Sequence, residues 1–584
     1  MNFLPTNKKE IKNKGLKQVD FVIVTGDAYV DHPSFGTSLI ARYLESFNYT
    51  CAILAQPNFN DDHSIMQCGC PRLAFLVSSG NIDSIVNNYY TSKQKRKQDV
   101  YSLNNKGHKR PDYATSVYTK MIRKTYGDIP IIIGGIEASL RRLAHYDFLQ
   151  DKLLPSILLT SSADLLVYGM GERAIIEIAD YLNSGLNIKD LTFIKGTAYQ
   201  TKDISLLDDY LMLPSFSAIK KDKKSFQDSF IKQYHNNENQ SAHMLIEPYQ
   251  DTYIVQNIPQ PILNTIELDH LYDLNFTYES YDEYHHKGTI TALKEIKFSI
   301  NINRGCNGGC HFCAITFHQG KQISMRSKAS CLKEAQKMQS LKDFKGYIHD
   351  VGGPTANFND EMCAKLNKYG SCSDKECLGF KICPNLKITH EKYFDILRSL
   401  RTLNGIKKVF VRSGIRYDYL LKDDPKYIEE LIKYHISGQL RLAPEHCANH
   451  VLRLMNKPSI SYYDKFVEIY HKINQQLGLK QFVVPYLMSS HPGSRIEDAI
   501  ALMNYLKKIN YKPLQVSDFM PSPSTLSTLM YYTQIDPFTN KNIYVAKSSE
   551  EKRTQQALLQ YHLPKNQKII QEILSKYPVY KKIK

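Results

Sequence analysis

Ile129-Pro130-Ile131-Ile132-Ile133-Gly134-Gly135 is the stretch that decides the fold of the N-terminal part of the chain. A continuous apolar run that ends in glycine predicts a strand buried on both faces. Leu165-Leu166-Val167-Tyr168-Gly169 repeats the pattern, and Phe21-Val22-Ile23-Val24 begins it. Because helical patterns separate these strands, residues 1–200 are predicted to form a doubly wound α/β domain around a parallel sheet.

The same alternation resumes at residue 291 and predicts a (βα)6 partial TIM-type barrel over residues 291–535. The six strand candidates are 296–302, 346–351, 408–412, 439–442, 482–487 and 514–519. Polar and glycine motifs follow these strands, at the carboxyl ends where such barrels place their active sites. Residues 201–290 have weaker periodicity and are predicted to be a connector, and residues 536–584 are predicted to form a basic helical tail.

The composition is typical of a globular protein. Hydrophobic residues make up 42% and charged residues 23% of the chain. The N-terminal residues are polar and basic, unlike a signal peptide, and no apolar run approaches the ~20 residues of a membrane span. We therefore expect a cytoplasmic protein that does not enter a membrane. The formal net charge of +17 makes a nucleic acid a possible partner, although a lysine-rich proteome gives the same excess.

Cys306-Asn307-Gly308-Gly309-Cys310-His311-Phe312-Cys313 is the most specific motif in the chain. Clustered thiols in a reducing compartment more often bind metal or carry out redox chemistry than form disulfides. Thiolates at this spacing can converge on one [4Fe-4S] cluster, which takes four thiolates for complete protein ligation. Three cysteines leave one iron open, as a catalytic cluster requires.

Other interpretations of this motif stay open. A structural zinc site usually shows paired spacings and four ligands. A four-thiolate electron-transfer cluster would need a distant fourth cysteine such as Cys331, and the thiols can also be inert. The rival class of protein is a non-catalytic iron–sulfur or zinc protein, such as a redox sensor or an RNA-binding scaffold.

Seven phrases closely resemble the YgiQ family of radical SAM proteins: RGCNGGCHFCAI, DVGGPTANF, CPNLKITH, VRSGIRYD, LRLAPEH, PYLMSSHPGS and DFMPSPSTLSTLMYY. The resemblance implies an enzyme in which Cys306, Cys310 and Cys313 bind the [4Fe-4S] cluster. S-adenosylmethionine would bind the open iron and be cleaved to methionine and a 5′-deoxyadenosyl radical, with a reductase, flavodoxin or ferredoxin as electron donor. The resemblance gives no catalytic residue and no substrate; RNA or protein modification is one hypothesis.

The resemblance also implies contacts to S-adenosylmethionine at the ends of several strands. The expected residues are Gly352, Gly353 and Pro354 in a turn at the methionine end, Ser413 and Arg416 near ribose or carboxylate, Glu445 as an acceptor for ribose or amine, and Gly493 and Ser494 near adenine. Glycine lets the backbone approach a ligand closely. Pro354 stands where the superfamily often has an acidic residue. Turn formation or barrel packing explains each of these residues equally well.

A second group of cysteines lies in a predicted insertion at 360–385. Cys363, Cys372, Cys377 and Cys383 form the pattern C-x8-C-x4-C-x5-C. Because so polar a segment can bury little apolar core, its four thiolates predict a bound metal that stabilises it, either zinc or a second iron–sulfur cluster. Because the spacing matches no common zinc finger, free or redox-active thiols are the alternative.

The N-terminal domain resembles the cobalamin-binding-like domain that precedes the barrel in some radical SAM proteins. Asp31-His32-Pro33-Ser34-Phe35-Gly36 is similar to the D-x-H-x-x-G loop in which His ligates cobalt, but here Asp and His are adjacent. Gly134-Gly135 and Gly169-Met170-Gly171-Glu172 fit later loops of such a fold. We therefore expect the fold without bound cobalamin, and we expect His32 to be an ordinary loop histidine.

Overall fold

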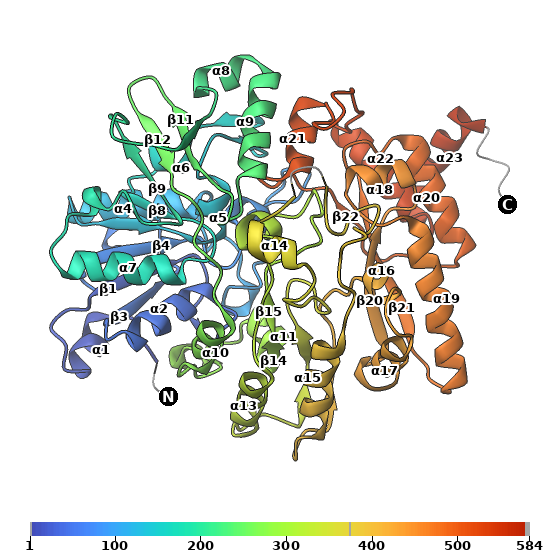
Figure 1. The fold of residues 1–584 in the computed structure, drawn as a ribbon, viewed down its shortest axis with the longest axis horizontal. Coiled ribbons are helices and arrows are strands. Elements are labelled where there is room, and N and C mark those ends of the chain that lie inside the picture. The colour runs from blue at the N-terminus through green and yellow to red at the C-terminus, as the bar shows by residue number, and fades with distance from the viewer. Residues whose placement is uncertain (1–2, 373–374, 579–584) are drawn as a thin grey trace.

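The structure consists of an N-terminal α/β domain and a C-terminal barrel, which lie next to each other in space (Figure 1). The computed structural model describes residues 3–372 and 375–578. Ser373 and Asp374, which belong to the insertion predicted at 360–385, lie outside these described residues. Within the described ranges, no helix has the length and apolar character that crossing a membrane would take.

A nine-stranded sheet forms the centre of the N-terminal domain. Five of its strands run parallel in the order β3-β1-β4-β5-β8, and the predicted apolar runs are among them. Their bounds are β1 (Phe21–Thr25), β3 (Cys51–Ala55), β4 (Ala74–Ser78), β5 (Ile131–Ile133) and β8 (Leu165–Val167). The strand order reverses between β1 and β4, and open α/β sheets bind ligands outside the carboxyl ends of their strands at such a point.

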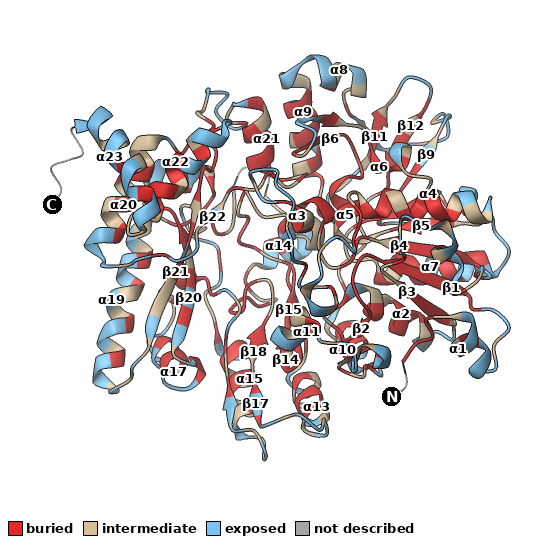
Figure 2. Ribbon diagram, turned by 180° about the vertical axis from the view of Figure 1, so that it is seen from behind, coloured by how far each residue is buried: buried red, intermediate tan, exposed pale blue. Residues whose placement is uncertain are grey.

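Helices cover both faces of this sheet, as predicted for a doubly wound domain. Phe21 and Ile23 of β1 pack into one hydrophobic core, and Val22 and Val24 pack into the core on the opposite face. The covering helices are α2 (Gly36–Ser46) and α7 (Glu172–Asn183) on the first face and α4 (Ala114–Tyr126) on the second. Figure 2 shows these strands as buried and the outer surfaces of the helices as exposed.

Residues 201–290, predicted to be a connector, differ from that expectation because they extend the N-terminal sheet. β12 pairs antiparallel with β9, and β11 and β10 continue the sheet beyond it. The bounds are β9 (Thr197–Thr201), β10 (Tyr210–Met212), β11 (Met244–Pro248) and β12 (Tyr253–Gln256). The periodicity is weak because β10 is a solvent-accessible edge strand and because the polar helices α8 (Phe216–Lys221) and α9 (Lys223–His235) interrupt the strands.

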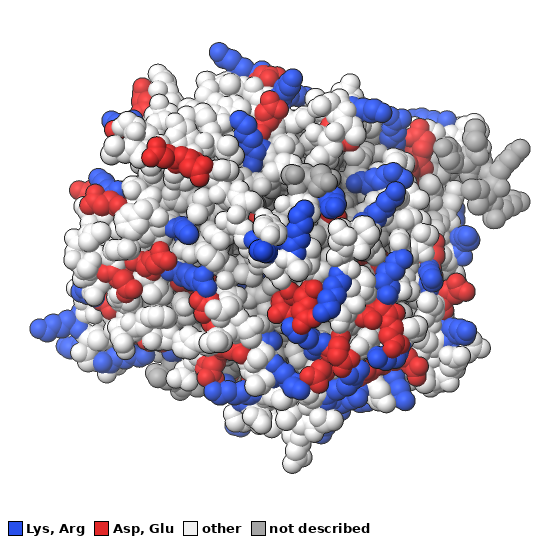
Figure 3. All heavy atoms as spheres, in the orientation of Figure 1, with Lys and Arg blue, Asp and Glu red and all other residues white. Residues whose placement is uncertain are grey.

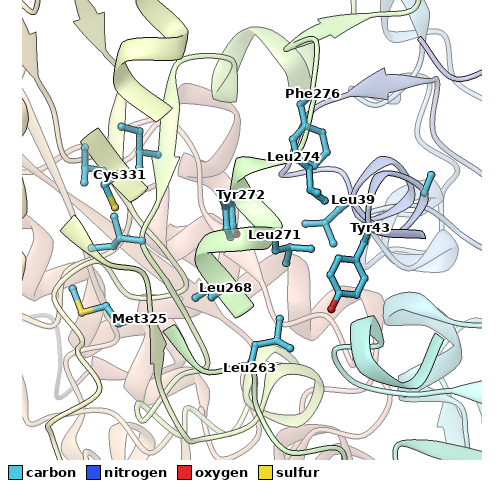
Figure 4. Packing of buried hydrophobic residues seen from close by; sticks show 14 of the residues in the cluster. Leu39, Tyr43, Leu263, Leu268, Leu271, Tyr272, Leu274, Phe276, Met325 and Cys331 are labelled. Atoms are coloured by element: carbon cyan, nitrogen blue, oxygen red, sulfur yellow. The ribbon is translucent and has the colours of Figure 1, made fainter. Parts of the chain in front are cut away.

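One continuous hydrophobic core joins the N-terminal domain to the barrel. Figure 4 shows Leu271 and Tyr272 of α10 (Thr265–Asp273) between Leu39 and Tyr43 of α2 on one side and Cys331 on the other. Cys331 belongs to α13 (Lys328–Gln339) and is fully buried. The helix α10 therefore packs on both domains within one core.

The C-terminal half forms the predicted partial barrel, with six strand positions that fall on the six predicted segments. Neighbouring strands β14/β18, β17/β19, β20/β21 and β21/β22 pair in parallel. The strands are β14 (Ser299–Asn301), β17 (Tyr347–Ile348) continued by β18 (Asp350–Gly352), β19 (Lys408–Val409), β20 (Gln439–Glu445), β21 (Phe482–Ser489) and β22 (Ser517–Asp518). The helices between them include α13, α15 (Glu391–Thr402), α17 (Lys426–His435), α19 (Ile460–Gln476) and α20 (Ile496–Lys508).

The helical tail covers one side of this barrel. Leu558 and Leu559 of α22 (Ser549–Leu559) pack with Ile500 and Met503 of α20, and α23 (Gln567–Lys576) completes the same cluster through Ile570. The tail therefore packs against the barrel through a hydrophobic cluster of its own, centred on α20.

Candidate functional site

The loop from Cys306 to Cys313 connects β15 (Asn303–Arg304) to the short helix α12 (Ile315–Gln319). Its three thiols lie close enough to influence one another. Burial and then the thiols of Cys310 and Cys306 raise the pKa of Cys313 to about 12. Burial and then Cys310 also raise the pKa of Cys306. Half-buried thiols gathered this closely favour a bound cation, because bound iron would compensate the negative charge of their thiolates.

The two glycines of this loop are required by close approach. A Cβ at Gly308 would lie 3.1 Å from Arg416 Nη1 and 3.3 Å from Cys306 Sγ. Gly309 has a left-handed φ of +56°, and a Cβ there would lie 2.9 Å from Glu376 Oε2. Only glycine adopts this conformation in this space without strain. The loop therefore suits three thiolates gathered around a compact group.

The donor set consists of three thiolates, which are the usual ligands of iron–sulfur clusters. Among the residues that the structure describes, no three His, Cys, Asp or Glu side chains are placed to hold one metal ion. The side chains of Cys306, Cys310 and Cys313 likewise do not meet at the position of one ion. In a [4Fe-4S] cluster each thiolate binds a different iron, so its ligands do not need to meet at one point.

Arg416 places a positive charge beside the cluster loop. Its guanidinium forms a buried ion pair with Asp418 (2.8 Å), and its Nη1 donates to Gly308 O at 3.4 Å. Asn357 holds the backbone of Arg416 through two hydrogen bonds. The charge of Arg416 opposes the rise in the pKa of Cys306. The structure thus brings one predicted cofactor-binding residue to the cysteine motif.

The predicted glycine turn also lies against the cluster loop. A Cβ at Gly352 would lie 2.6 Å from Ser413 Oγ, and a Cβ at Gly353 would lie 2.1 Å from Asn303 Oδ1. Asn303 Nδ2 donates to the carbonyl oxygens of Thr355 (3.2 Å) and Phe358 (3.1 Å). Pro354 stands between Gly353 and Thr355, whose Oγ1 lies 3.5 Å from Cys306 Sγ.

Ser413 and the turn share an anchor on β18. The Ser413 hydroxyl donates to Asp350, whose carboxylate also accepts a hydrogen bond from Ser413 N at 3.0 Å. This side chain therefore has a partner in the protein, and its predicted contact to ribose or carboxylate stays a prediction. Asn303 and Thr355, which hold the turn in place, were missed by sequence reasoning because no motif spacing marks them.

Glu445 lies in a strained conformation at the end of β20. It has a left-handed φ of +67°, next to an irregularity in the β20/β21 pairing. Burial raises the pKa of its carboxyl, and the nearby charge of Lys457 opposes that rise. Lys457 also opposes the rise in the pKa of Cys313, so both residues lie near the cluster loop. Strained backbone of this kind is concentrated at functional sites.

Gly493 and Ser494 contact other parts of the barrel. A Cβ at Gly493 would lie 2.1 Å from Leu454 Cδ1 of α18 (Asn449–Leu454). The Ser494 hydroxyl donates to Gln555 Oε1 of α22 at 3.1 Å. These contacts support a packing role for both residues, and their placement near adenine stays a prediction.

A cavity of about 480 Å³ lies between the two domains, at the carboxyl ends of β1, β4, β5 and β8. Its N-terminal wall includes the glycine turns Gly134–Gly135 and Gly169–Gly171, and its barrel wall includes Asn301, Arg304, His318 and Gln319. Within the described ranges, three residues that line the cavity carry a buried polar atom without a hydrogen-bond partner: Glu172 Oε2, Asn301 Oδ1 and His318 Nδ1. Unsatisfied polar atoms of this kind are uncommon in folded proteins, and here they lie in residues of the cavity wall.

His32 lies near this cavity without lining it. Its ring is buried and packs edge-on against Tyr278, with the ring centroids 5.0 Å apart. Its Nδ1 accepts a hydrogen bond from Ser34 N (3.1 Å), and burial lowers its pKa to about 3. The next two residues, Pro33 and Ser34, line the cavity.

Family models match most of the chain. The model described as Radical SAM N-terminal matches residues 3–299, and the model described as Radical SAM superfamily matches residues 300–522. A domain of unknown function, DUF3362, matches residues 514–577.

A UPF0313 protein of Clostridium botulinum (strain Kyoto / Type A2) is 49% identical over 577 residues, 99% of this chain and 90% of that protein. A UPF0313 protein of Clostridium perfringens (strain SM101 / Type A) is 47% identical over 98% of this chain and 87% of that protein.

Two solved structures are similar at low sequence identity. The methyltransferase TsrM from Kitasatospora setae, with cobalamin and a [4Fe-4S] cluster bound, has a TM-score of 0.49 and 13% identity, over 86% of this chain and 76% of TsrM. OxsB, with aqua-cobalamin and S-adenosylmethionine bound, has a TM-score of 0.46 and 12% identity, over 97% of this chain and 63% of OxsB.

The expectation that cobalamin is not bound is contradicted by these comparisons. TsrM and OxsB, to which the chain is similar, were both solved with cobalamin bound. That expectation depended on the spacing of Asp31 and His32, which concerns only one ligand of cobalt. A cofactor's wider binding surface comes from cavity shape and backbone turns, and a short motif does not describe either.

Proposed function

The chain belongs to the radical SAM superfamily, and on that premise we propose that it is an enzyme that binds a [4Fe-4S] cluster through Cys306, Cys310 and Cys313. We propose further that it binds S-adenosylmethionine at the open iron and cleaves it reductively. When bound, the cluster supplies the electron that splits this cofactor into methionine and a 5′-deoxyadenosyl radical. A reductase, flavodoxin or ferredoxin is the proposed source of that electron.

The observation that carries this proposal is the meeting of three elements at one loop. The three thiols belong to the loop itself, Thr355 after the Gly352–Gly353 turn lies 3.5 Å from Cys306 Sγ, and the guanidinium of Arg416 donates to Gly308 O. The absence of a side chain at Gly352 and Gly353 lets the turn pack closely against Ser413 and Asn303. The positive charge of Arg416 favours the thiolate form of Cys306, which is the form that binds iron.

Buried residues beside the half-buried thiols, such as Asn307 and His311, contribute to the proposed reaction by excluding water. A 5′-deoxyadenosyl radical is reactive, so a site that shields it prevents side reactions. Glu445 and Lys457 are charged residues near the cluster loop, and we propose that they orient the polar groups of S-adenosylmethionine.

The interdomain cavity is the proposed position of the substrate or of a further cofactor. It has room for a small molecule or for one projecting group of an RNA or a protein, and its unpartnered polar atoms supply acceptors for that group. On the face shown in Figure 3, basic and acidic side chains are interspersed. That face therefore offers less support for an RNA-binding scaffold than the net charge alone suggests.

The test is the formation of 5′-deoxyadenosine by the reconstituted protein. The full-length chain is loaded with iron and sulfide under anaerobic conditions, reduced with dithionite and incubated with S-adenosylmethionine, and the products are measured by mass spectrometry. We expect 5′-deoxyadenosine and methionine from the wild type and from Cys70→Ala, which changes an exposed thiol in the N-terminal domain. Cys310→Ala should form neither product. Equal product formation by Cys310→Ala and wild type would refute the assignment.

A further inference from the structure

The segment between β18 and α15 carries a second group of thiols beside the first. It runs from Gly353 to His390, and in its described part the only helix is α14 (Ala364–Tyr369). Segments longer than about 12–15 residues with so little regular structure are uncommon in compact domains and are usually functional. The segment therefore needs a source of order other than helix or sheet.

Cys377 and Cys383 stand opposite each other across a tight hairpin in this segment. Leu378 and Ile382 form an antiparallel bridge, and Cys383 N donates to Cys377 O at 3.0 Å. Side chains directly opposite each other in an antiparallel pair lie on the same face, with Cβ atoms about 5 Å apart. The hairpin thus presents two thiols side by side.

Cys363 approaches this pair from the start of α14. Its Sγ accepts a hydrogen bond from Leu366 N at 3.4 Å. The thiols of Cys363 and Cys383 both lie within electrostatic reach of Cys377. All three thiols pack against one apolar cluster, which includes Met362, Leu378 and Leu386. Cys306 of the first motif packs against that cluster too.

The hairpin is fixed directly onto the cluster loop. Glu376, next to Cys377, accepts hydrogen bonds from Tyr234 Oη (2.6 Å) and Lys321 Nζ (3.1 Å), and its carboxylate occupies the space beside Gly309. Asn456 donates to Gly309 O at 2.9 Å and packs against Gly379 of the hairpin. The second thiol group is therefore held at a defined place beside the first.

We propose that Cys363, Cys377 and Cys383 bind a second iron–sulfur cluster, with Cys372 as the fourth thiolate that the same segment offers. The set contains only thiolates, which are the usual ligands of such clusters. As at the first motif, the described side chains are not placed to meet at one ion, whereas each thiolate of a cluster binds a different iron. Bound metal would also supply the order that this polar segment lacks, because metal binding contributes to folding.

The experiment removes the first cluster and asks whether iron remains. Reconstituted full-length wild type, the triple variant Cys306→Ala/Cys310→Ala/Cys313→Ala and a quintuple variant that adds Cys377→Ser and Cys383→Ser are analysed for iron, sulfide and zinc. We expect the triple variant to keep half of the wild-type iron and sulfide, and the quintuple variant to lose that half. Cys70→Ser, which changes an exposed thiol elsewhere, should keep the full amount.

A second measurement uses the wild-type protein, so its result does not depend on whether a variant folds correctly. Cysteines of the reconstituted wild type are alkylated before and after removal of iron with a chelator, and labelled peptides are quantified by mass spectrometry. The proposal requires Cys363, Cys377 and Cys383 to be protected before chelation and labelled after it. Equal labelling in both states would overturn the proposal, and so would one zinc per chain in place of iron in the triple variant.

Discussion

Gly353→Ala tests whether the glycine turn positions S-adenosylmethionine beside the cluster. The new Cβ would lie 2.1 Å from Asn303 Oδ1 and 2.8 Å from Asn303 O, so the turn must move by more than 1 Å to restore ordinary contact. Asn303 cannot simply rotate away, because its Nδ2 donates to Thr355 O and Phe358 O. Overpacking of this kind costs roughly 1–3 kcal/mol.

The expected result is a loss of affinity for S-adenosylmethionine of about tenfold or more, since about 1.4 kcal/mol corresponds to a factor of ten. Iron content should stay near the wild-type value, because the cysteines are unchanged. Binding is measured by equilibrium dialysis of the reconstituted protein, with iron quantified in parallel. Gly414→Ala is the matched control, since a Cβ at Gly414 meets nothing within 4 Å. Equal affinities in the two variants would refute the role assigned to the turn.

Three further predictions concern charge and burial. Cys331→Ala should keep the full iron content, because this thiol is buried in the interdomain core; an iron loss as large as that of Cys310→Ala would contradict this. Arg416→Met should destabilise the apo-protein by about 3–5 kcal/mol in urea denaturation, because Asp418 is left buried without its partner, and Arg416→Met/Asp418→Leu should recover most of that loss. Equal losses in the single and double variants would refute this pairing. Burial lowers the pKa of His435 to about 4 from its ordinary value near 6.5. The unfolded chain therefore binds a proton that the folded chain does not, and this group's contribution to stability falls as the pH drops from about 6.5 to about 4. Thermal melting of His435→Gln should be less sensitive to pH over that window than melting of the wild type, and parallel profiles would argue against it.

The strands of both domains could be predicted because most carry their signal locally. The strand β5 in the apolar run at 129–133 is buried at every residue, so burial leaves a continuous apolar pattern there. In the barrel strands β20 and β21, buried residues lie between exposed or partly exposed ones, and their signal is the regular succession of strand and helix patterns along the chain. The strand β10 left no such pattern, since its residues are partly or fully exposed at the sheet edge. Its membership of the sheet depends on pairing with β11, which is a long-range contact that local sequence does not encode.

The candidate site divides in the same way. The cysteine motif and the glycine turn carry fixed spacing, so they were found in the sequence. Asn303, Thr355 and Lys457 were missed because they act only after distant segments meet. The spacing of Asp31 and His32 could not predict the interdomain cavity, because residues from both domains form its wall.

The arrangement of the two domains explains why the cavity and the cluster loop lie on either side of one short helix. Parallel strands direct their following loops to one end of a sheet, and the shared core of α10 brings the loop ends of both domains to face each other. The helix α12 begins just after Cys313, and its Ile315 and His318 line the interdomain cavity. Thr316 and Phe317 of the same helix line a smaller cavity together with Cys310 and Cys313. A ligand that shifts α12 from the interdomain side would therefore move residues that also border the cysteines, which gives the N-terminal domain a direct physical route to the chemistry of the barrel.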